Sequence, residues 1–135
     1  MFESETYVRV RYAETDRMGY VYYGNYSEYY EVGRVEALRQ LGMSYREMED
    51  SGIMLPVLNF SIKYYKPAYY DDLLRVKTII AELPKTRIKF IYQIYNANNV
   101  LLNEGETTLV FVKIQTGKPC MVPEAFLQKL KPFFK

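Results

Sequence analysis

The residues with the clearest chemical potential lie between positions 12 and 26, in the run YAETDRMGYVYYGNY. The carboxylate Asp16 stands shortly before a helical pattern begins. In that place it can act as base or nucleophile toward an electrophile whose developing oxyanion is bound by free amides at the helix start, here those of Tyr23 and Gly24. The local pattern alone favours a structural interpretation, in which Asp16 forms an Asx turn or a helix cap.

Two other residues of this run have competing interpretations. Glu14 lies two positions before Asp16 and is an alternative catalytic carboxylate. Asn25 directly precedes the helical pattern, so we expect it to cap the central helix, and contact with a ligand is the alternative.

The composition excludes several mechanisms. The chain contains no histidine, which removes Ser-His-Asp and Cys-His nucleophilic couples and histidine metal ligands. One cysteine, Cys120, cannot form an internal disulfide or a cysteine-rich zinc site. We therefore expect no metal and no cofactor, and any chemistry must use carboxylates, Lys, Tyr or backbone amides.

The size and charge of the chain indicate its class. With 135 residues, it is expected to form a single domain over 1–135. A net charge of +2 gives no support for nucleic-acid binding, and no apolar run approaches the ~18 residues of a membrane span. The start MFESETYVRV lacks the apolar core of a signal peptide, so a cytoplasmic location is expected.

The central element that must position Asp16 is a predicted helix over 26–41. Its apolar face carries Tyr26, Tyr30, Gly33, Ala37 and Leu41. The two small residues in the middle of that face indicate close approach of another backbone. A glycine at 42 ends the helix, and a capping box in SYRE predicts a second, short helix from 44 to about 50.

Period-two alternation predicts the remaining elements as strands over 6–12, 58–64, 74–80, 88–95 and 100–114, with Gly105 as a candidate bulge. Short connections require antiparallel pairing. A terminal amphipathic helix follows Pro123. The expected fold is of the α+β class, a five-stranded antiparallel sheet wrapped around one long helix, with the basic face of the sheet left for solvent or a partner subunit.

The run from Tyr12 to Gly42 resembles the signature segment of the hotdog-fold acyl-CoA thioesterases, the group around 4-hydroxybenzoyl-CoA thioesterase and the thioesterases associated with the Tol-Pal system. The family has a T/C-D-x-x-G-x-V motif before an aromatic-rich Asn-Tyr pair. The matching positions are Asp16, Gly19, Val21, Asn25 and Tyr26. The likeness continues through IKYYKPAYYDDLLRVKT, KTRIKF and EGETTLVFV, and so covers nearly the whole chain.

The resemblance implies hydrolysis of an acyl-CoA, with Asp16 as general base or as nucleophile on the thioester carbonyl. It implies that the amide of Tyr23 binds the oxyanion, and it makes the catalytic interpretation of Asp16 the preferred one. It also implies a homotetramer, a dimer of dimers in which two sheets join edge to edge and each active site lies at a dimer interface.

The resemblance also points to a phosphate subsite for coenzyme A. Lys85, Arg87 and Lys89 match the region where the 4-hydroxybenzoyl relatives hold these phosphates, and positions two apart share a strand face. An ordinary solvated strand face is an equal alternative.

Many Tol-Pal-type members carry a histidine where this chain has Tyr23, which we expect to line the pocket. The missing imidazole removes the mechanism that uses Asp and His together. The absence of histidine also favours a second interpretation, in which the protein is a non-catalytic hotdog subunit that binds an acyl thioester or a protein partner. It also disfavours hotdog dehydratase chemistry, which relies on histidine. The pairs Tyr64-Tyr65 and Tyr69-Tyr70 are candidates for the acyl pocket or for interface packing.

Overall fold

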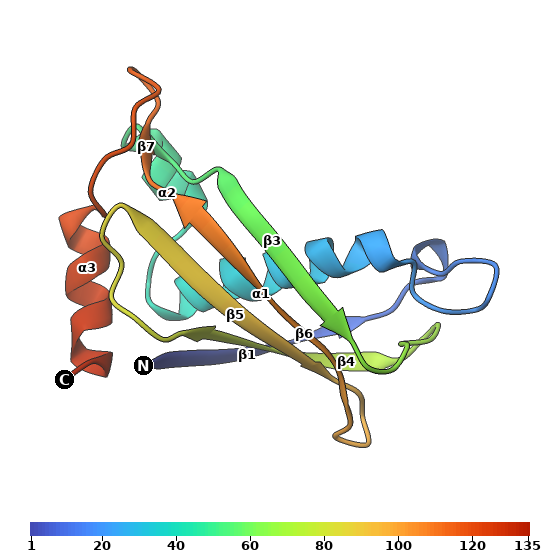
Figure 1. The fold of residues 1–135 in the computed structure, drawn as a ribbon. Coiled ribbons are helices and arrows are strands. Elements are labelled where there is room, and N and C mark those ends of the chain that lie inside the picture. Colours follow the sequence, from blue (N-terminus) through green and yellow to red (C-terminus); the bar gives the residue numbers. More distant parts are fainter.

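A computed structural model describes residues 1–135 and contains one five-stranded antiparallel sheet with a long helix against one of its faces (Figure 1). The strands follow the spatial order β1-β4-β5-β6-β3. Their bounds are β1 Phe2–Arg9, β3 Val57–Tyr64, β4 Leu73–Ile80, β5 Arg87–Tyr95 and β6 Leu101–Val110. The helices are α1 Tyr26–Gln40, α2 Tyr45–Asp50 and α3 Glu124–Leu130, and a two-stranded sheet pairs β2 Ile53–Met54 with β7 Val112–Lys113. The α+β hotdog architecture predicted from the sequence is confirmed.

Helix α1 buries the predicted apolar face, and Gly42 with φ of 80° allows the chain to leave the helix. A Cβ atom at Gly33 would stand 2.6 Å from Thr78 Oγ1 and 2.9 Å from Val76 Cγ1. The close approach predicted at this position is therefore confirmed: α1 packs against β4, and the nearest atoms are side-chain atoms of Thr78 and Val76. The short helix α2 is capped as predicted, since Ser44 Oγ accepts a hydrogen bond from the Glu47 amide at 3.1 Å.

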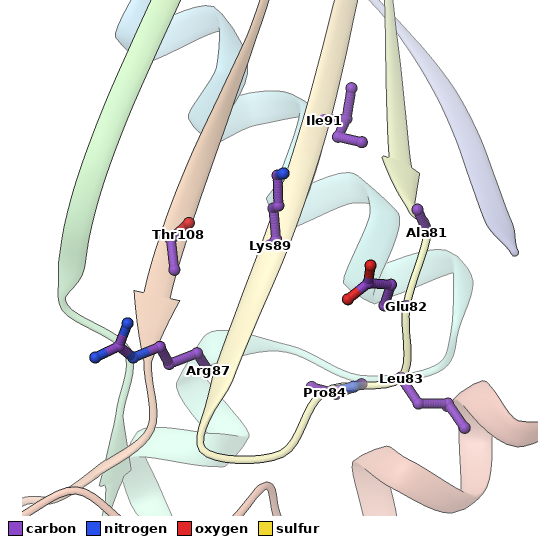
Figure 2. Close-up of a pocket in the computed structure, with 8 residues that line it drawn as sticks. All are labelled: Ala81, Glu82, Leu83, Pro84, Arg87, Lys89, Ile91 and Thr108. Atoms are coloured by element: carbon purple, nitrogen blue, oxygen red, sulfur yellow. The ribbon is translucent and has the colours of Figure 1, made fainter.

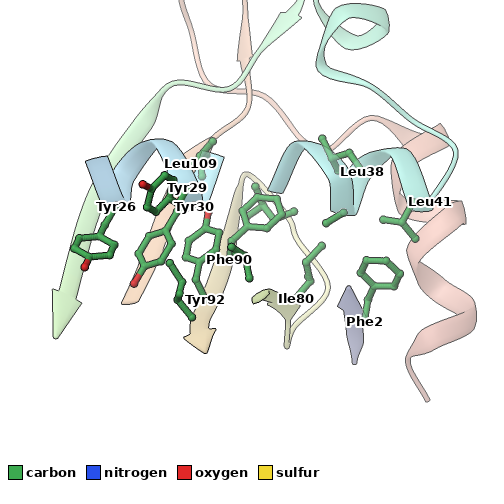
Figure 3. Packing of buried hydrophobic residues seen from close by; sticks show 14 of the residues in the cluster. Phe2, Tyr26, Tyr29, Tyr30, Leu38, Leu41, Ile80, Phe90, Tyr92 and Leu109 are labelled. Carbon is green, nitrogen blue, oxygen red and sulfur yellow. The ribbon is translucent and has the colours of Figure 1, made fainter. Parts of the chain in front are cut away.

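The core lies between α1 and the sheet (Figure 3). Alternate residues of β4 and β5 are buried, which is the pattern expected for strands with one covered face. The rings of Tyr30 and Tyr92 stack with centroids 4.3 Å apart. The Tyr30 hydroxyl donates a 2.6 Å hydrogen bond to Asn103 Oδ1, and both residues are fully buried. The core is thus aromatic and contains a polar contact that joins α1 to β6.

Three strand boundaries differ from the sequence prediction by more than one residue. The first strand ends at Arg9, where we expected position 12. The first strand begins at Phe2, where we expected position 6, because residues 2–5 pair with residues 77–80 of β4 and bury Phe2 and Ser4. The strand predicted over 100–114 ends at Val110, after which residues 112–113 pair with β2 in the second sheet. The buried Phe111 marks this change of sheet, and its amide donates to the Thr86 carbonyl.

The prediction of a bulge at Gly105 was wrong. Gly105 pairs in register with Ile62 and Tyr92, and the irregularities of the ladder lie elsewhere. A Cβ atom there would stand 2.4 Å from the Ser61 carbonyl oxygen and 2.8 Å from Tyr30 Cε2. The glycine therefore serves close packing, because it leaves room for the Tyr30 ring on the face of β6.

Helix α3 follows Pro123 as predicted and buries Phe126 and Leu130. None of the helices has both the length and the apolar character needed to cross a membrane.

Candidate active site

Asp16 lies in a tight turn between β1 and α1. The Asp16 amide donates to the Tyr20 carbonyl at 2.7 Å, and Gly19 has a φ of 84°. Asp16 Oδ1 accepts hydrogen bonds from the amides of Met18 at 2.9 Å and Tyr20 at 3.3 Å. The Asx-turn geometry is present, as the local pattern suggested. It uses only Oδ1, so the turn holds the carboxylate in place while Oδ2 makes no hydrogen bond within the chain.

The Asp16 carboxylate lines a cavity of about 330 Å³ at the end of β3. The other lining residues are mainly aromatic: Met18, Tyr20, Val21, Tyr23, Tyr26, Tyr64, Tyr65, Lys66 and Pro67. The volume falls within the range of small-ligand sites, and the few polar groups in a mostly apolar wall are typical of them. The prediction that Tyr23 and Tyr64-Tyr65 line a pocket with Asp16 agrees with this arrangement.

The amides at the start of the helix are available as donors. A 3-10 turn over Tyr23–Asn25 leads directly into α1, and neither the Tyr23 nor the Gly24 amide donates a hydrogen bond within the chain. Helix starts leave such donors unsatisfied, and they favour negative charge. Tyr23 lines the cavity that contains Asp16, whereas Gly24 and Asn25 are outside its lining.

Asn25 occupies the predicted cap position of α1, but its side chain makes no capping hydrogen bond. Its Nδ2 donates instead to the Glu14 carbonyl oxygen at 2.8 Å. The predicted capping contact was therefore wrong. The backbone of Asn25 is already helical, and its side chain does not cap α1. The side chain instead joins the start of α1 to the turn over Tyr12–Glu14.

Glu14 is buried, with 6% of its surface exposed, and is not part of the cavity lining. Its carboxylate accepts hydrogen bonds from the Arg11 amide at 2.8 Å and the Tyr29 hydroxyl at 3.0 Å, and it forms an ion pair with the Arg11 guanidinium at 3.0 Å. Burial alone would raise the pKa of Glu14, but the hydrogen bonds and the Arg11 charge lower it below the ordinary 4.5. Of the two carboxylates considered from the sequence, Asp16 is the one that faces the cavity.

We expect Glu14→Gln to lower the free energy of unfolding at pH 7 by about 1–2 kcal/mol, because it weakens buried hydrogen bonds to a charged acceptor. A carboxylate whose folded pKa is depressed contributes stability above its unfolded pKa and loses that contribution as the pH falls through the folded pKa. The difference between the two proteins should therefore shrink as the pH falls below about 4.5. Urea unfolding between pH 3 and pH 7 measures this, and a pH-independent difference would contradict it.

The basic residues predicted to hold phosphates lie at a different place. Arg87 and Lys89 line a cavity of about 270 Å³ together with Glu82 and Thr108, and Figure 2 shows them on β5 beside the loop that follows β4. Both are exposed and share the outer face of the strand, as predicted. Lys89 pairs with Glu106 at 3.1 Å. Lys85 is exposed in the preceding loop and is not part of this cavity lining.

One chain does not bring Asp16 and these basic residues together. Tyr64, at the Asp16 cavity, is level with Asn103 of β6, which in turn pairs with Ile94 of β5. Lys89 lies five residues before Ile94, which is roughly 17 Å along the strand. The Asp16 cavity and the basic residues therefore lie toward opposite ends of the sheet.

The sequence did not indicate that Met18, Tyr20 and Lys66 belong to the cavity. Met18 and Tyr20 follow Asp16 by two and four positions, and their amides donate to its carboxylate. Their spacing from Asp16 in the loop could therefore have indicated that they lie beside it. An isolated bridge between Tyr20 and Tyr69 brings the loop after β3 against the Asp16 turn, which is a long-range contact with no local signal.

Comparisons with known proteins identify the family of the chain. The family model described as thioesterase-like superfamily matches residues 10–130. The chain is 36% identical to the acyl-CoA thioester hydrolase YbgC of Escherichia coli O157:H7, over 92% of either chain. It is 34% identical to the 1,4-dihydroxy-2-naphthoyl-CoA hydrolase of Thermosynechococcus vestitus, over 90% of this chain and 84% of the relative.

Among solved structures, the DHNA-CoA thioesterase from Staphylococcus aureus is similar with a TM-score of 0.89 and 35% identity, covering 100% of this chain and 97% of the other. Both the sequence and the fold therefore match over nearly the whole length. The chain belongs to the thioesterase-like superfamily.

Proposed function

We propose that this protein is an acyl-CoA thioesterase that hydrolyses its substrate to a free acid and coenzyme A, with Asp16 as the catalytic carboxylate. The names of the relatives support the reaction. The observation that carries the assignment of Asp16 is geometric. Its Oδ2 makes no hydrogen bond within the chain, and the carboxylate shares a cavity wall with Tyr23, whose amide is an unused donor.

In the proposed reaction, Asp16 takes a proton from water as the water oxygen adds to the thioester carbon. The carbonyl oxygen becomes an oxyanion, which the amides of Tyr23 and Gly24 stabilise. The carbon–sulfur bond then breaks, and the proton passes from Asp16 to the leaving thiolate. In the alternative route, Asp16 attacks the thioester carbon, the carbon–sulfur bond breaks and coenzyme A leaves as the thiolate. Water then hydrolyses the resulting mixed anhydride, which restores the Asp16 carboxylate, releases the free acid and supplies the proton that the thiolate takes. One donor to an oxyanion contributes roughly 10²–10³ to kcat in other enzymes.

The proposal includes the homotetramer implied by the family resemblance, in which dimers form by pairing of sheet edges. Strand β3 is one of the two edge strands of the sheet, and its exposed side chains include Val57, Leu58, Phe60 and Tyr64. An uncovered apolar edge strand is a template for pairing with another chain. Antiparallel pairing of two copies of β3 would bring the Val57 end of one copy, which is level with Ile88 of β5 and so beside Arg87 and Lys89, to the Asp16 cavity of the other. A cytoplasmic location is a further prediction.

If Arg87 and Lys89 of one copy bind the phosphates of coenzyme A, replacing both by Ala should raise KM for an acyl-CoA by about tenfold and leave kcat nearly unchanged, because each exposed contact contributes up to about 1 kcal/mol. The effect should fall at high salt. It should vanish with the matching acyl-pantetheine, which has no phosphates.

The control for this pair is Lys77→Ala, since Lys77 lies on β4 and pairs with Glu3 at 3.5 Å, outside the cavity that contains Arg87. Steady-state kinetics on the two substrates gives the comparison. A KM increase that is equal for acyl-CoA and acyl-pantetheine would contradict phosphate binding at Arg87 and Lys89.

A further inference from the structure

A separate cavity of about 300 Å³ lies between α1, α2 and the sheet. Arg34 and Tyr45 line it from the two helices, and Leu55 and Leu109 form part of its apolar wall. It shares no residue with the cavity that contains Asp16 or with the cavity that contains Arg87. The function proposed above uses none of these side chains.

Arg34 is a cation without a counter-charge. Its Nε is buried and has no hydrogen-bond partner, and no carboxylate lies within 4.0 Å of its nitrogens. Three other arginines are paired, namely Arg11 with Glu14, Arg39 with Glu36 and Arg75 with Glu5. Several further arginines have no carboxylate partner, but none of them has a buried nitrogen without a hydrogen-bond partner. Removing a cation from water without a paired anion is costly, so this position is suited to an anion that arrives from outside the chain.

The neighbours of Arg34 are neutral hydroxyl groups, those of Tyr92 and Tyr45. The Tyr92 hydroxyl is engaged with Thr107 Oγ1 at 2.6 Å, whereas the Tyr45 hydroxyl is buried and without a partner. Burial raises the pKa of Tyr45, so the hydroxyl keeps its proton at neutral pH. A guanidinium and a free hydroxyl in the same cavity are two kinds of donor that an oxyanion can accept from together.

We propose that the cavity around Arg34 binds a small organic carboxylate. The partly buried guanidinium of Arg34, whose Nε is fully buried, matches one negative charge and has the planar donor geometry that a carboxylate fits. Glu31 and Glu49 also line the cavity, as do Arg39 and Arg46. The lining residues together carry one net positive charge, which matches a monoanion better than a dianion such as phosphate. Val35, Leu55 and Leu109 provide an apolar wall for the body of the ligand. The site is independent of the proposed thioesterase reaction.

The test is calorimetric titration of the full-length protein with benzoate and hexanoate, beside benzamide as a neutral analogue and inorganic phosphate as a dianion. Saturable binding is expected for the carboxylates, at least tenfold weaker binding for phosphate and none for benzamide. Arg34→Gln should weaken carboxylate binding at least tenfold, and Tyr45→Phe should weaken it severalfold. The control Arg46→Gln, at the same cavity, should stay within about threefold, because Arg46 is exposed.

Three results would overturn the proposal: no carboxylate binding, equal binding by the wild type and Arg34→Gln, or tighter binding by Asp16→Asn. The last result would assign the ligand to the Asp16 cavity, because the substitution removes a like charge there. A change in the oligomeric mass of Arg34→Gln with unchanged carboxylate binding would instead assign the counter-charge to a second copy. If Arg34→Gln does not fold, the effect of Tyr45→Phe on carboxylate binding tests the proposal by itself, and unchanged binding by that variant contradicts it. Because no turnover is measured, failure of the thioesterase assignment leaves these results unaffected.

Discussion

Asp16→Asn is expected to lower kcat for acyl-CoA hydrolysis by about a thousandfold, within the range typical for removal of a general base. Asparagine has the same shape and can still accept the amide hydrogen bonds of Met18 and Tyr20 through its carbonyl oxygen. It cannot take the proton of an attacking water, and its amide is a poor nucleophile. Thiol release from short, long, branched and aromatic acyl-CoAs measures the effect and tests the proposed activity at the same time.

The matched control for this variant is Asp72→Asn. Asp72 is also a loop carboxylate, and its Oδ2 accepts a hydrogen bond from the Tyr69 amide at 2.9 Å, but it is not part of the cavity wall. Its kcat should remain within about threefold of the wild type. If Asp16→Asn hydrolyses the same substrates at an undiminished rate, Asp16 is not the catalytic group.

Gly105→Ala is expected to lower the free energy of unfolding by about 3 kcal/mol, at the upper end for overpacking of a core. The added Cβ would meet the Ser61 carbonyl oxygen at 2.4 Å and the Tyr30 ring at 2.8 Å. The first contact is with the backbone of the paired strand, so relief requires β3 and β6 to separate. Chemical denaturation followed by circular dichroism measures the loss.

Gly117→Ala provides the comparison, because Gly117 has a φ of 69° and a Cβ atom added there would have no neighbour within 4 Å. Its cost arises only from the backbone conformation and should be about 1 kcal/mol. Equal effects of the two substitutions would show that crowding by Ser61 and Tyr30 does not explain the glycine at 105.

Much of the fold was predictable because its signals are local. The burial of one face of α1, the cap at Ser44 and the alternation in β4 and β5 all depend on spacing within one element. The errors concern long-range contacts. The end of β6 is set by the pairing of β7 with β2, and Gly105 is explained by a tyrosine 75 positions earlier in the chain.

The candidate site was only partly predictable, for a similar reason. Local pattern identified Asp16 and the free amides but favoured a structural turn, and only the family resemblance gave Asp16 a catalytic role. The structure shows the turn on Oδ1 and leaves Oδ2 without a hydrogen bond within the chain, so the turn is compatible with the catalytic role proposed for Asp16. The gathering of Tyr20, Tyr26 and Tyr64 around it depends on how three separate segments pack, which spacing along the chain does not encode.

The buried hydrogen bond between Tyr30 and Asn103 determines how α1 is placed along the sheet. Tyr30 lies one turn after the start of α1, where the amides of Tyr23 and Gly24 lead into the helix. A slide of α1 along the sheet by one turn would leave both buried polar groups unpaired, at a cost of several kcal/mol. This hydrogen bond in the core therefore fixes the position of α1 along the sheet, and with it the position of the proposed oxyanion donors relative to Asp16.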